Sequence, residues 1–335
     1  MKWPKAIRTN DWWEVKLSPL LAIGYATTLL YGQDIFNHAI TYLLTLISVA
    51  AGAVYVSIVN DIADIEQDRL AGKANRMAKI RPTRRWMMPL LCIAAGVAFI
   101  CFVYYPDKLS VFLYLMPWVA FSLYSFKPVR LKSRGLWGVL ADASGSHVFI
   151  SLLMVSFISF KSGHDVDWLW FAVVGAWALC YGIRGILWHQ FYDRDNDLRS
   201  NEKTFATTIK PEKIKGWGVL VFTIEMIATV SMLLLLSNTM AYMALVCYFL
   251  LVLMRHYFHS SSPVIIRVPD SDNWFIWMLD FWQALFPLAL LLSAASSQSN
   301  AWVILAAHII LFPVTITRIT KEAMKFFLRL LKTKP

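Results

Sequence analysis

Long apolar stretches separated by short polar connections run along the whole chain. Ten of them contain about 17–25 mostly apolar residues, and a helix needs roughly 20 such residues to cross the hydrocarbon core of a bilayer. They lie at residues 17–33, 39–60, 86–105, 109–126, 136–160, 167–191, 216–236, 239–258, 275–296 and 301–319. The pattern predicts an all-α, multi-pass membrane protein with a single membrane-embedded domain over residues 1–335.

The composition agrees with this prediction. Hydrophobic residues make up 58% of the 335 residues and charged residues 16%, whereas soluble domains contain about 45–50% apolar and about 25% charged residues. The net charge of +11 comes from basic clusters that flank the apolar stretches, which is a signal of membrane topology. The expected surroundings are therefore the lipid bilayer, and nucleic acid is excluded as a partner.

Basic residues occupy every second connection between the predicted helices. They cluster before the first helix and at residues 69–85, 127–134, 194–215 and 318–334. The intervening turns at residues 33–38, 105–108, 161–165, 237–239 and 297–300 contain only Lys108 and Lys161. Because Lys and Arg are enriched in cytoplasmic loops, ten crossings with both termini and both long polar loops in the cytoplasm satisfy the pattern. The expected location is the inner membrane of a bacterial cell.

The two ends of the chain differ in character. Residues 1–16 combine basic residues with Trp3, Trp12 and Trp13, which is typical of a segment that lies at the membrane interface. Residues 318–335 mix basic and apolar residues. We expect them to form a basic cytoplasmic tail that is attracted to anionic lipid.

An acidic motif follows the second predicted helix. Asn60, Asp64 and Asp68 are spaced four residues apart, and Asp61 lies beside them. On a helix this spacing places the side chains in one stripe, where like charges destabilise the helix unless a cation lies against them. The motif therefore predicts a site for positive charge.

A second acidic motif repeats this spacing after the sixth predicted helix, with His189, Asp193 and Asp197. Carboxylate oxygens are ligands of hard cations, and Mg²⁺ is usually bound by one or two carboxylates together with phosphate oxygens. Two matched stripes therefore predict bound Mg²⁺, with Mn²⁺ as the alternative. The predicted metal ligands are Asp61, Asp64, Asp68, Asp193 and Asp197.

Acidic residues at a membrane exit can also be solvated loop caps, and a single motif would favour that interpretation. Here basic residues follow each stripe: Lys73 and Arg76 follow the first, and Lys203 follows the second. Lys and Arg bind phosphate oxygens, so the two motifs together contain the components of a diphosphate site.

The sequence NDIADIEQD at residues 60–68 resembles the NDxxDxxxD motif of the UbiA superfamily of intramembrane prenyltransferases. The sequence DRDND at residues 193–197 resembles the second, DxxxD motif of that superfamily. The resemblance covers about residues 15–300. It implies a bundle of nine core helices, to which the predicted helix at residues 301–319 would add a tenth.

A third segment, YSFKPVRLKSRG at residues 124–135, is similar to a string found in the chlorophyll- and tocopherol-synthase-like branch of the superfamily. The resemblance implies that Tyr124 guards a carbocation or contacts phosphate, with a packing role as the alternative. It also implies that Lys127 and Arg130 bind the diphosphate. Tyr124 precedes Lys127 by three residues and not by four as in the family's YxxxK form, so which lysine acts there stays open.

The resemblance implies that a prenyl diphosphate ionises to an allylic carbocation and pyrophosphate, and that the cation is transferred to an acceptor that the sequence does not identify. The aspartates of both motifs would be catalytic through their metal ions, and Lys73, Arg76 and Lys203 would bind the diphosphate. Asn60 and His189 head their stripes and would coordinate or orient the substrate, with a structural hydrogen bond as the alternative for His189.

Two other functions compete with this one. A terpene cyclase of the same fold would ionise the same substrate without an acceptor, and the metal motifs do not separate it from a transferase. A transporter is less favoured, because the acidic stripes lie at helix ends and not at broken helices near the midplane.

Four charged residues fall within predicted crossings, where charges are costly and usually functional. They are Asp142, Arg184, Glu225 and Asp280. Asp142 and Asp280 lie one to two turns from the cytoplasmic end of their helices. The sequence favours a structural ion pair between Arg184 and Glu225, with acceptor binding as the alternative.

Overall fold

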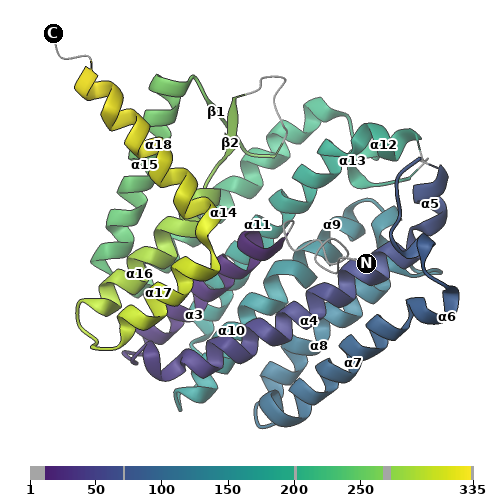
Figure 1. Ribbon diagram of the computed structural model, residues 1–335, viewed down its shortest axis with the longest axis horizontal. Coiled ribbons are helices and arrows are strands. Elements are labelled where there is room, and N and C mark those ends of the chain that lie inside the picture. Colours follow the sequence, from purple (N-terminus) through teal and green to yellow (C-terminus); the bar gives the residue numbers. More distant parts are fainter. Residues whose placement is uncertain (1–11, 71, 200–201, 267–272, 333–335) are drawn as a thin grey trace.

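The computed structural model describes residues 12–70, 72–199, 202–266 and 273–332. They form a bundle of long helices (Figure 1), which confirms the predicted all-α membrane fold. Six of the described helices are individually long and apolar enough to cross a membrane. Most of the predicted interfacial segment, residues 1–11, and the end of the predicted tail, residues 333–335, lie outside the described residues.

The first part of the chain contains eleven helical segments. They are η1 (Trp13–Leu17), α3 (Ser18–Leu30), η2 (Phe36–His38), α4 (Ala39–Ala63), α5 (Ile65–Leu70), η3 (Met77–Lys79), α6 (Pro82–Arg85), α7 (Met87–Phe99), η4 (Ile100–Tyr104), α8 (Lys108–Ser125) and η5 (Leu131–Ser133). The segments η1 and η4 are π-helices. η1 leads directly into α3, and η4 follows directly after α7. Asp107 begins α8, because its carboxylate accepts hydrogen bonds from the backbone N–H groups of Leu109 (3.1 Å) and Ser110 (3.2 Å).

The second part continues the bundle. Its helices are α9 (Leu136–Ala143), η6 (Ser144–Val148), α10 (Phe149–Lys161), α11 (Trp168–Tyr192), α12 (Arg194–Arg199), α13 (Phe205–Thr208), η7 (Pro211–Lys213), α14 (Ile214–Leu236), α15 (Thr239–His259), η8 (Phe281–Leu285), α16 (Phe286–Ala295), α17 (Ala301–Leu311) and α18 (Pro313–Lys332). A short parallel strand pair, β1 (Ser262–Val264) with β2 (Trp274–Ile276), connects α15 to η8. The sequence pattern did not predict these strands, because each is only three residues long.

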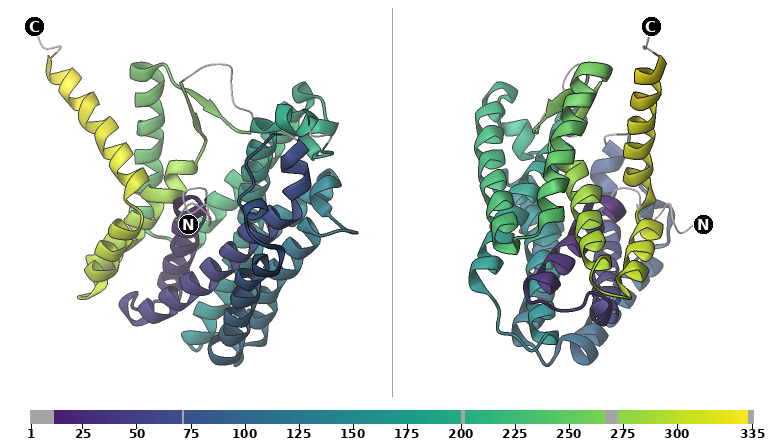
Figure 2. Two further views of the ribbon diagram at one scale, coloured as in Figure 1. Left: turned by 45° about the vertical axis from the view of Figure 1, so that its right-hand side comes forward. Right: turned by 90° about the vertical axis from the view of Figure 1, so that its left-hand side faces the viewer.

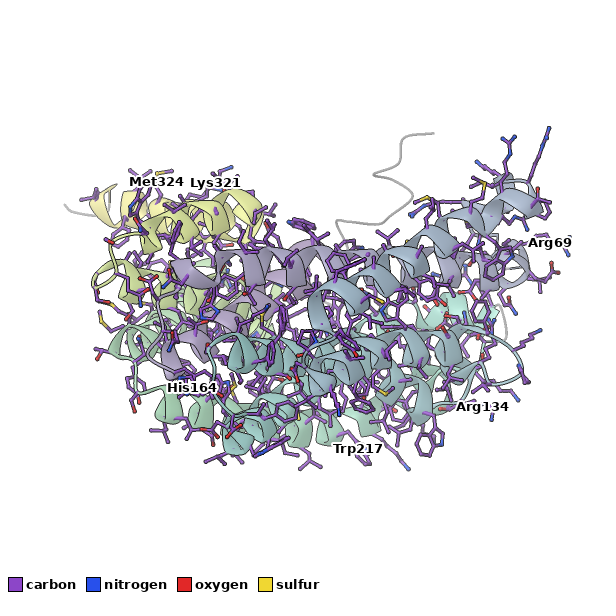
Figure 3. All side chains as sticks on the ribbon, turned by 90° about the horizontal axis from the view of Figure 1, so that it is seen from below. Arg69, Arg134, His164, Trp217, Lys321 and Met324 are labelled. Atoms are coloured by element: carbon purple, nitrogen blue, oxygen red, sulfur yellow. The ribbon has the colours of Figure 1, made fainter. Side chains whose placement is uncertain are left out.

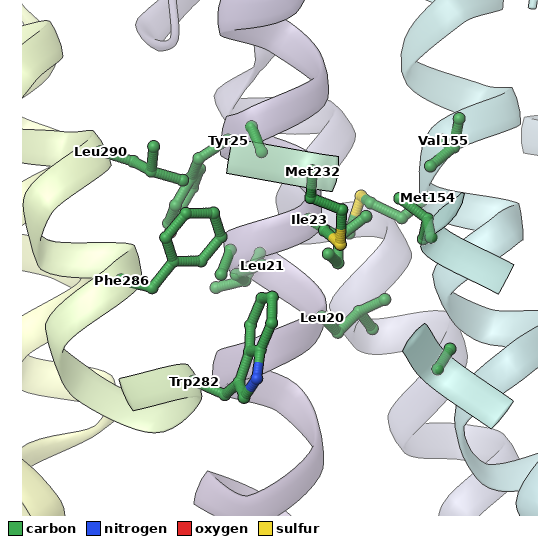
Figure 4. Close-up of a cluster of buried hydrophobic side chains, with 14 of the residues drawn as sticks. Leu20, Leu21, Ile23, Tyr25, Met154, Val155, Met232, Trp282, Phe286 and Leu290 are labelled. Atoms are coloured by element: carbon green, nitrogen blue, oxygen red, sulfur yellow. The ribbon is translucent and has the colours of Figure 1, made fainter. Parts of the chain in front are cut away.

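Helix α3 lies in the core of the bundle. Every residue from Ser18 to Thr28 is buried, as expected for a helix that is apolar on all sides. Figure 4 shows its side chains between Trp282 and Phe286 on one side and Met154 on the other. A Cβ atom at Gly24 would lie 3.0 Å from the sulfur of Met154, so the absence of a side chain there lets α10 approach α3. Side chains on α7 such as Leu90 and Leu91 are exposed instead, which fits contact with lipid.

The stretch predicted as the tenth crossing does not form one straight helix. The axes of α17 and α18 differ by 87°, and the break falls at Pro313, which cannot donate the backbone hydrogen bond of a continuing helix. The 11 residues of α17 span only about 16 Å. Helix α18 contacts α15 through Glu322 and Phe326, and its C-terminal end projects from the bundle in the left view of Figure 2. Figure 3 places its Lys321 and Met324 at the opposite edge of the molecule from Arg69 and Arg134.

We expect the C-terminus to be cytoplasmic. Helix α18 carries Lys321, Lys325 and Arg329 among exposed apolar residues such as Phe327 and Leu328, and such a helix is attracted to an anionic leaflet by about 1 kcal/mol per basic residue. A reporter that functions only in the cytoplasm should therefore be active when it is fused after Pro335. Activity of an extracytoplasmic reporter at the same position would contradict this orientation.

The intramembrane charges are mostly paired. The guanidinium of Arg184 contacts both carboxylate oxygens of Glu225, at 2.6 and 2.8 Å, and both side chains are buried. The predicted Arg184–Glu225 ion pair is therefore present. Asp280 accepts hydrogen bonds from Arg255 on α15 and Arg318 on α18. These contacts connect α11 to α14, and α18 to the rest of the bundle.

Candidate active site

The two acidic motifs have the same local backbone structure. Helix α4 ends at the first motif and helix α11 at the second, and a short helix follows each of them after one non-helical aspartate. The N–H of Asp64 donates to the carbonyl of Asn60, and the N–H of Asp193 donates to the carbonyl of His189, each over 3.0 Å. One turn later Asp197 donates in the same way to Asp193. Corresponding side chains of the two motifs are therefore presented in the same manner.

Both motifs line a single cavity of about 290 Å³. Its wall includes residues of α4, α5, α11 and α12, and Figure 1 shows α5 and α12 at the right of the molecule. Six carboxylates belong to its walls: Asp61, Asp64, Asp68, Asp193, Asp197 and Glu202. The predicted residues Asn60, Lys73, Tyr124 and His189 also line it. Two segments more than a hundred residues apart in the sequence thus build one site.

The cavity has an excess of negative charge. Two lysines, Lys73 and Lys132, face its six carboxylates. The pKa of Asp197 is raised to about 6, mainly by burial and further by the nearby charges of Asp193 and Glu202, although Lys73 and a hydrogen bond from Thr204 lower it. A bound cation would relieve this repulsion.

The donor set fits a hard divalent cation that is shared with a phosphate group. Within the described residues, no three His, Cys, Asp or Glu side chains already form a closed metal site. Mg²⁺ does not need one, because it usually takes one or two protein carboxylates and completes its shell with water and phosphate oxygens. Lys73 already connects the two motifs, since its ammonium lies 4.0 Å from the Asp193 carboxylate.

Asn75 organises the loop after the first motif, a role that sequence analysis missed. Its side-chain N–H₂ group donates to the Asp68 carboxylate and to the backbone carbonyl of Asp61, both over 2.7 Å. Its side-chain oxygen accepts from the N–H groups of Met77 and Ala78. Asn75 is also buried. It therefore holds Asp68 and the chain that carries Lys73 in place.

Replacement of Asn75 by Ala should loosen this loop. The change leaves the Asp61 carbonyl and the buried N–H of Met77 without the Asn75 side chain as partner, which costs about 1–3 kcal/mol. We expect a lower midpoint of thermal unfolding in detergent and faster protease cleavage within residues 72–80. Asn37→Ala, at an exposed position near the other end of α4, is the matched control and should change neither. Equal behaviour of the two variants would contradict the assignment.

The third predicted segment joins the two motifs. Arg130 is buried and donates to the carboxylates of Asp64 (3.0 Å) and Glu202 (3.4 Å). Its backbone is left-handed, with φ 39°, a conformation that is costly for a residue other than glycine and that persists where the surroundings enforce it. Gly135 and Thr204 also pair as an isolated parallel bridge. The segment therefore packs against both acidic loops at once.

Glu202 and Lys132 are functional candidates that sequence analysis did not select. Burial alone would raise the pKa of Glu202, but a hydrogen bond from Ser133 and the charges of Lys132 and Arg130 lower it below its ordinary value. Lys132 donates to Asp64 and lines the cavity, whereas Lys127 is exposed and is not among the residues of the cavity wall. Lys132 is therefore the lysine of this segment that lies at the site.

The remaining predicted residues lie around the cavity. Arg130 contacts it through Asp64. Arg76 and Lys203 are not among the residues that line the cavity. Lys203 directly precedes Thr204, which lines it. For Asn60, the oxygen of its side chain accepts a hydrogen bond from Ser125 on α8. Binding of diphosphate by Arg76, Lys127 and Lys203 stays a prediction.

A second, apolar cavity of about 110 Å³ lies one helical turn deeper. The two cavities lie along the same helices: Ser57 and Phe121 line the deeper one, while Asn60 and Tyr124, three residues further along α4 and α8, line the acidic one. Three residues of helix rise about 4.5 Å. The acidic cavity and the apolar one are therefore adjacent compartments along the same helices.

Comparison with known proteins agrees with this architecture. The model of the UbiA prenyltransferase family matches residues 20–279. A solved UbiA homolog from Archaeoglobus fulgidus has 14% sequence identity and a TM-score of 0.54, and the match covers 96% of this chain and 99% of that one. The same homolog bound to Cd²⁺ gives 15% identity and a TM-score of 0.53 over the same shares. At this identity the likeness shows a shared fold.

None of the curated proteins compared with the chain matches it. The family model nevertheless spans most of the sequence, and it includes all three segments that build the acidic cavity. The chain is therefore a multi-pass membrane protein that belongs to the UbiA prenyltransferase family.

Proposed function

We propose that the protein transfers a prenyl group from a prenyl diphosphate to an acceptor, with Mg²⁺ as cofactor. The observation that carries the proposal is the stacking of the two cavities. A prenyl diphosphate has a highly charged head and an apolar tail. The acidic cavity and the apolar cavity one turn deeper, between the same helices, match these two parts in the right order.

The charge of the site requires a metal for this role. Six carboxylates and two lysines would repel a diphosphate in the absence of cations. Mg²⁺ ions held by the aspartates would attract it and would stabilise the negative charge that develops as the carbon–oxygen bond breaks. Lys73 and Lys132 are placed to contact the phosphate oxygens directly.

The chemistry then divides between the cavities. The carbon–oxygen bond breaks and its electron pair leaves with the pyrophosphate in the acidic cavity, so the allylic fragment carries the positive charge. Tyr124 lies at the boundary, and Phe121 and Trp118 line the apolar side; aromatic faces stabilise cations. The acceptor supplies the electron pair of the new bond and releases a proton to the pyrophosphate.

A terpene cyclase remains the second candidate, because the aromatic lining of the apolar cavity would also suit a cation that closes on its own double bonds. The test is incubation of the purified protein with a ladder of prenyl diphosphates and Mg²⁺, with and without membrane extract, followed by mass spectrometry. A prenylated product that forms only with extract supports the transferase. A terpene hydrocarbon or alcohol formed without extract supports the cyclase.

Removal of the metal should stop the reaction. In excess EDTA we expect no product above background, and Mg²⁺ added in excess of the chelator should restore the original rate. Calcium-saturated EDTA is the control for effects of the chelator itself. Full turnover in free EDTA would refute the role of the aspartates as metal ligands.

A further inference from the structure

The apolar cavity contains a single charged residue. Lys16 lines it together with aromatic and small side chains, and the other residues of its described wall carry no charge. Among the described residues, Lys16 has no hydrogen bond and no carboxylate within ion-pair distance. An ammonium group in apolar surroundings is costly unless it is paired. Asp142 interacts with this ammonium electrostatically but not within ion-pair distance, and a hydrocarbon chain offers it no further partner.

Two π-helices contribute residues to the wall of the apolar cavity. Lys16 belongs to the π-helix η1, and Gly145 and Ser146, on the cavity wall facing it, belong to the π-helix η6. Such π-helical turns are rare and frequent at functional sites. Ser146 donates a hydrogen bond of 3.4 Å to Asp142, and Asp142 interacts electrostatically with Lys16 and with His189 of the acidic cavity. Asp142 thus connects Lys16 electrostatically to the acidic cavity.

We infer that Lys16 binds an anionic oxygen of the acceptor, such as a carboxylate or an enolate, and that its free ammonium restrains ionisation until the acceptor is bound. The inference rests on the proposed function, since it concerns the acceptor of the same reaction. The inference distinguishes a transferase from a cyclase, because a positive charge on the wall of the apolar cavity opposes a carbocation in that cavity unless an anionic acceptor binds the ammonium.

The physical reason is the sign of the charges. An allylic carbocation that forms at the boundary between the cavities is repelled by Lys16, and in a medium of low effective dielectric this repulsion is substantial over several ångströms. An anionic acceptor neutralises the ammonium and brings electron density next to the cation. The acceptor then serves both as nucleophile and as the group that removes the repulsion.

The experiment measures pyrophosphate release from geranyl diphosphate and Mg²⁺ without acceptor. Lys16→Met has a similar length and no charge, and we expect it to release pyrophosphate at least about tenfold faster than the wild type. Lys16→Arg should behave like the wild type. Lys108→Met, an exposed lysine at the opposite end of α8, is the matched control and should not change the rate.

A second arm uses a charged probe and its neutral isostere. Benzoate should accelerate pyrophosphate release by the wild type and not by Lys16→Met, whereas benzamide should affect neither. Equal rates for wild type and Lys16→Met, or equal effects of benzoate on both, would overturn the inference. Lys16→Gln removes the same charge and replaces Lys16→Met if that variant does not fold.

Binding of geranyl thiolodiphosphate separates this inference from the proposed function. Mg²⁺-dependent binding by the wild type and by Lys16→Met shows that both are folded and hold the diphosphate. If the wild type does not bind it, the proposed function fails. If both bind it and Lys16→Met shows no faster release, only the role of Lys16 fails.

Discussion

Asp193→Ala is expected to lower turnover by at least about 10³-fold while the protein stays folded in the membrane. The carboxylate lies on the wall of the acidic cavity, and its loss would remove a proposed ligand of the metal that stabilises the leaving pyrophosphate, an effect of several kcal/mol on the barrier. Its side chain is 50% exposed and contacts Lys73 only at 4.0 Å, so little stability is lost. Initial rates at saturating Mg²⁺ and prenyl diphosphate test this expectation.

Asp195→Ala is the matched control. Asp195 is exposed and is not among the residues that line the cavity, so this variant should retain nearly full activity. Asp64→Ala is a poorer choice for the test, because it would also leave buried Arg130 and Lys132 without their shared carboxylate, which destabilises the protein by itself. Retention of more than a tenth of the wild-type rate by Asp193→Ala would argue against metal binding there.

Arg184→Met is expected to destabilise the protein by about 3–5 kcal/mol, the usual cost of leaving one member of a buried ion pair alone. Glu225 is completely buried, and Arg184 also donates to the backbone carbonyl of Trp277 over 2.9 Å. Thermal or denaturant unfolding in detergent gives the measurement. The change should lower the unfolding midpoint strongly even though Arg184 lies outside the acidic cavity.

The double variant Arg184→Met with Glu225→Leu supplies the decisive comparison. It removes both charges and leaves only the carbonyl contacts unmet, so it should be clearly more stable than either single variant. A double variant whose loss equals the sum of the two single losses would show that the residues do not stabilise each other.

The acidic stripes were predictable because they follow a local rule. A spacing of four residues places Asp64 and Asp68, or Asp193 and Asp197, on one side of a helix whatever the rest of the chain does. That the two stripes line one cavity could be inferred only from their matching positions at the ends of helices. The family resemblance at the same residues agreed with that inference, and the family assignment is confirmed.

The residues that sequence analysis missed act through tertiary contacts. Glu202 and Lys132 meet at the site because the segment after α8 folds over both acidic loops, and neither has a periodic signal of its own. Lys16 looked like one more cytoplasmic charge before the first helix, but the π-helix η1 brings it to the wall of an apolar cavity. The bend at Pro313, in contrast, had a visible local cause.

The pair formed by Arg184 and Glu225 also has a consequence for how the chain enters the membrane. An arginine at the centre of an isolated helix opposes insertion by about 2.5–3.5 kcal/mol, and its partner is on the next long helix, α14. We expect α11 and α14 to leave the translocon together as a hairpin, since the charges can then neutralise each other before either meets lipid. The second acidic motif follows α11 directly within the same hairpin, so we expect the same insertion step to deliver it to its position.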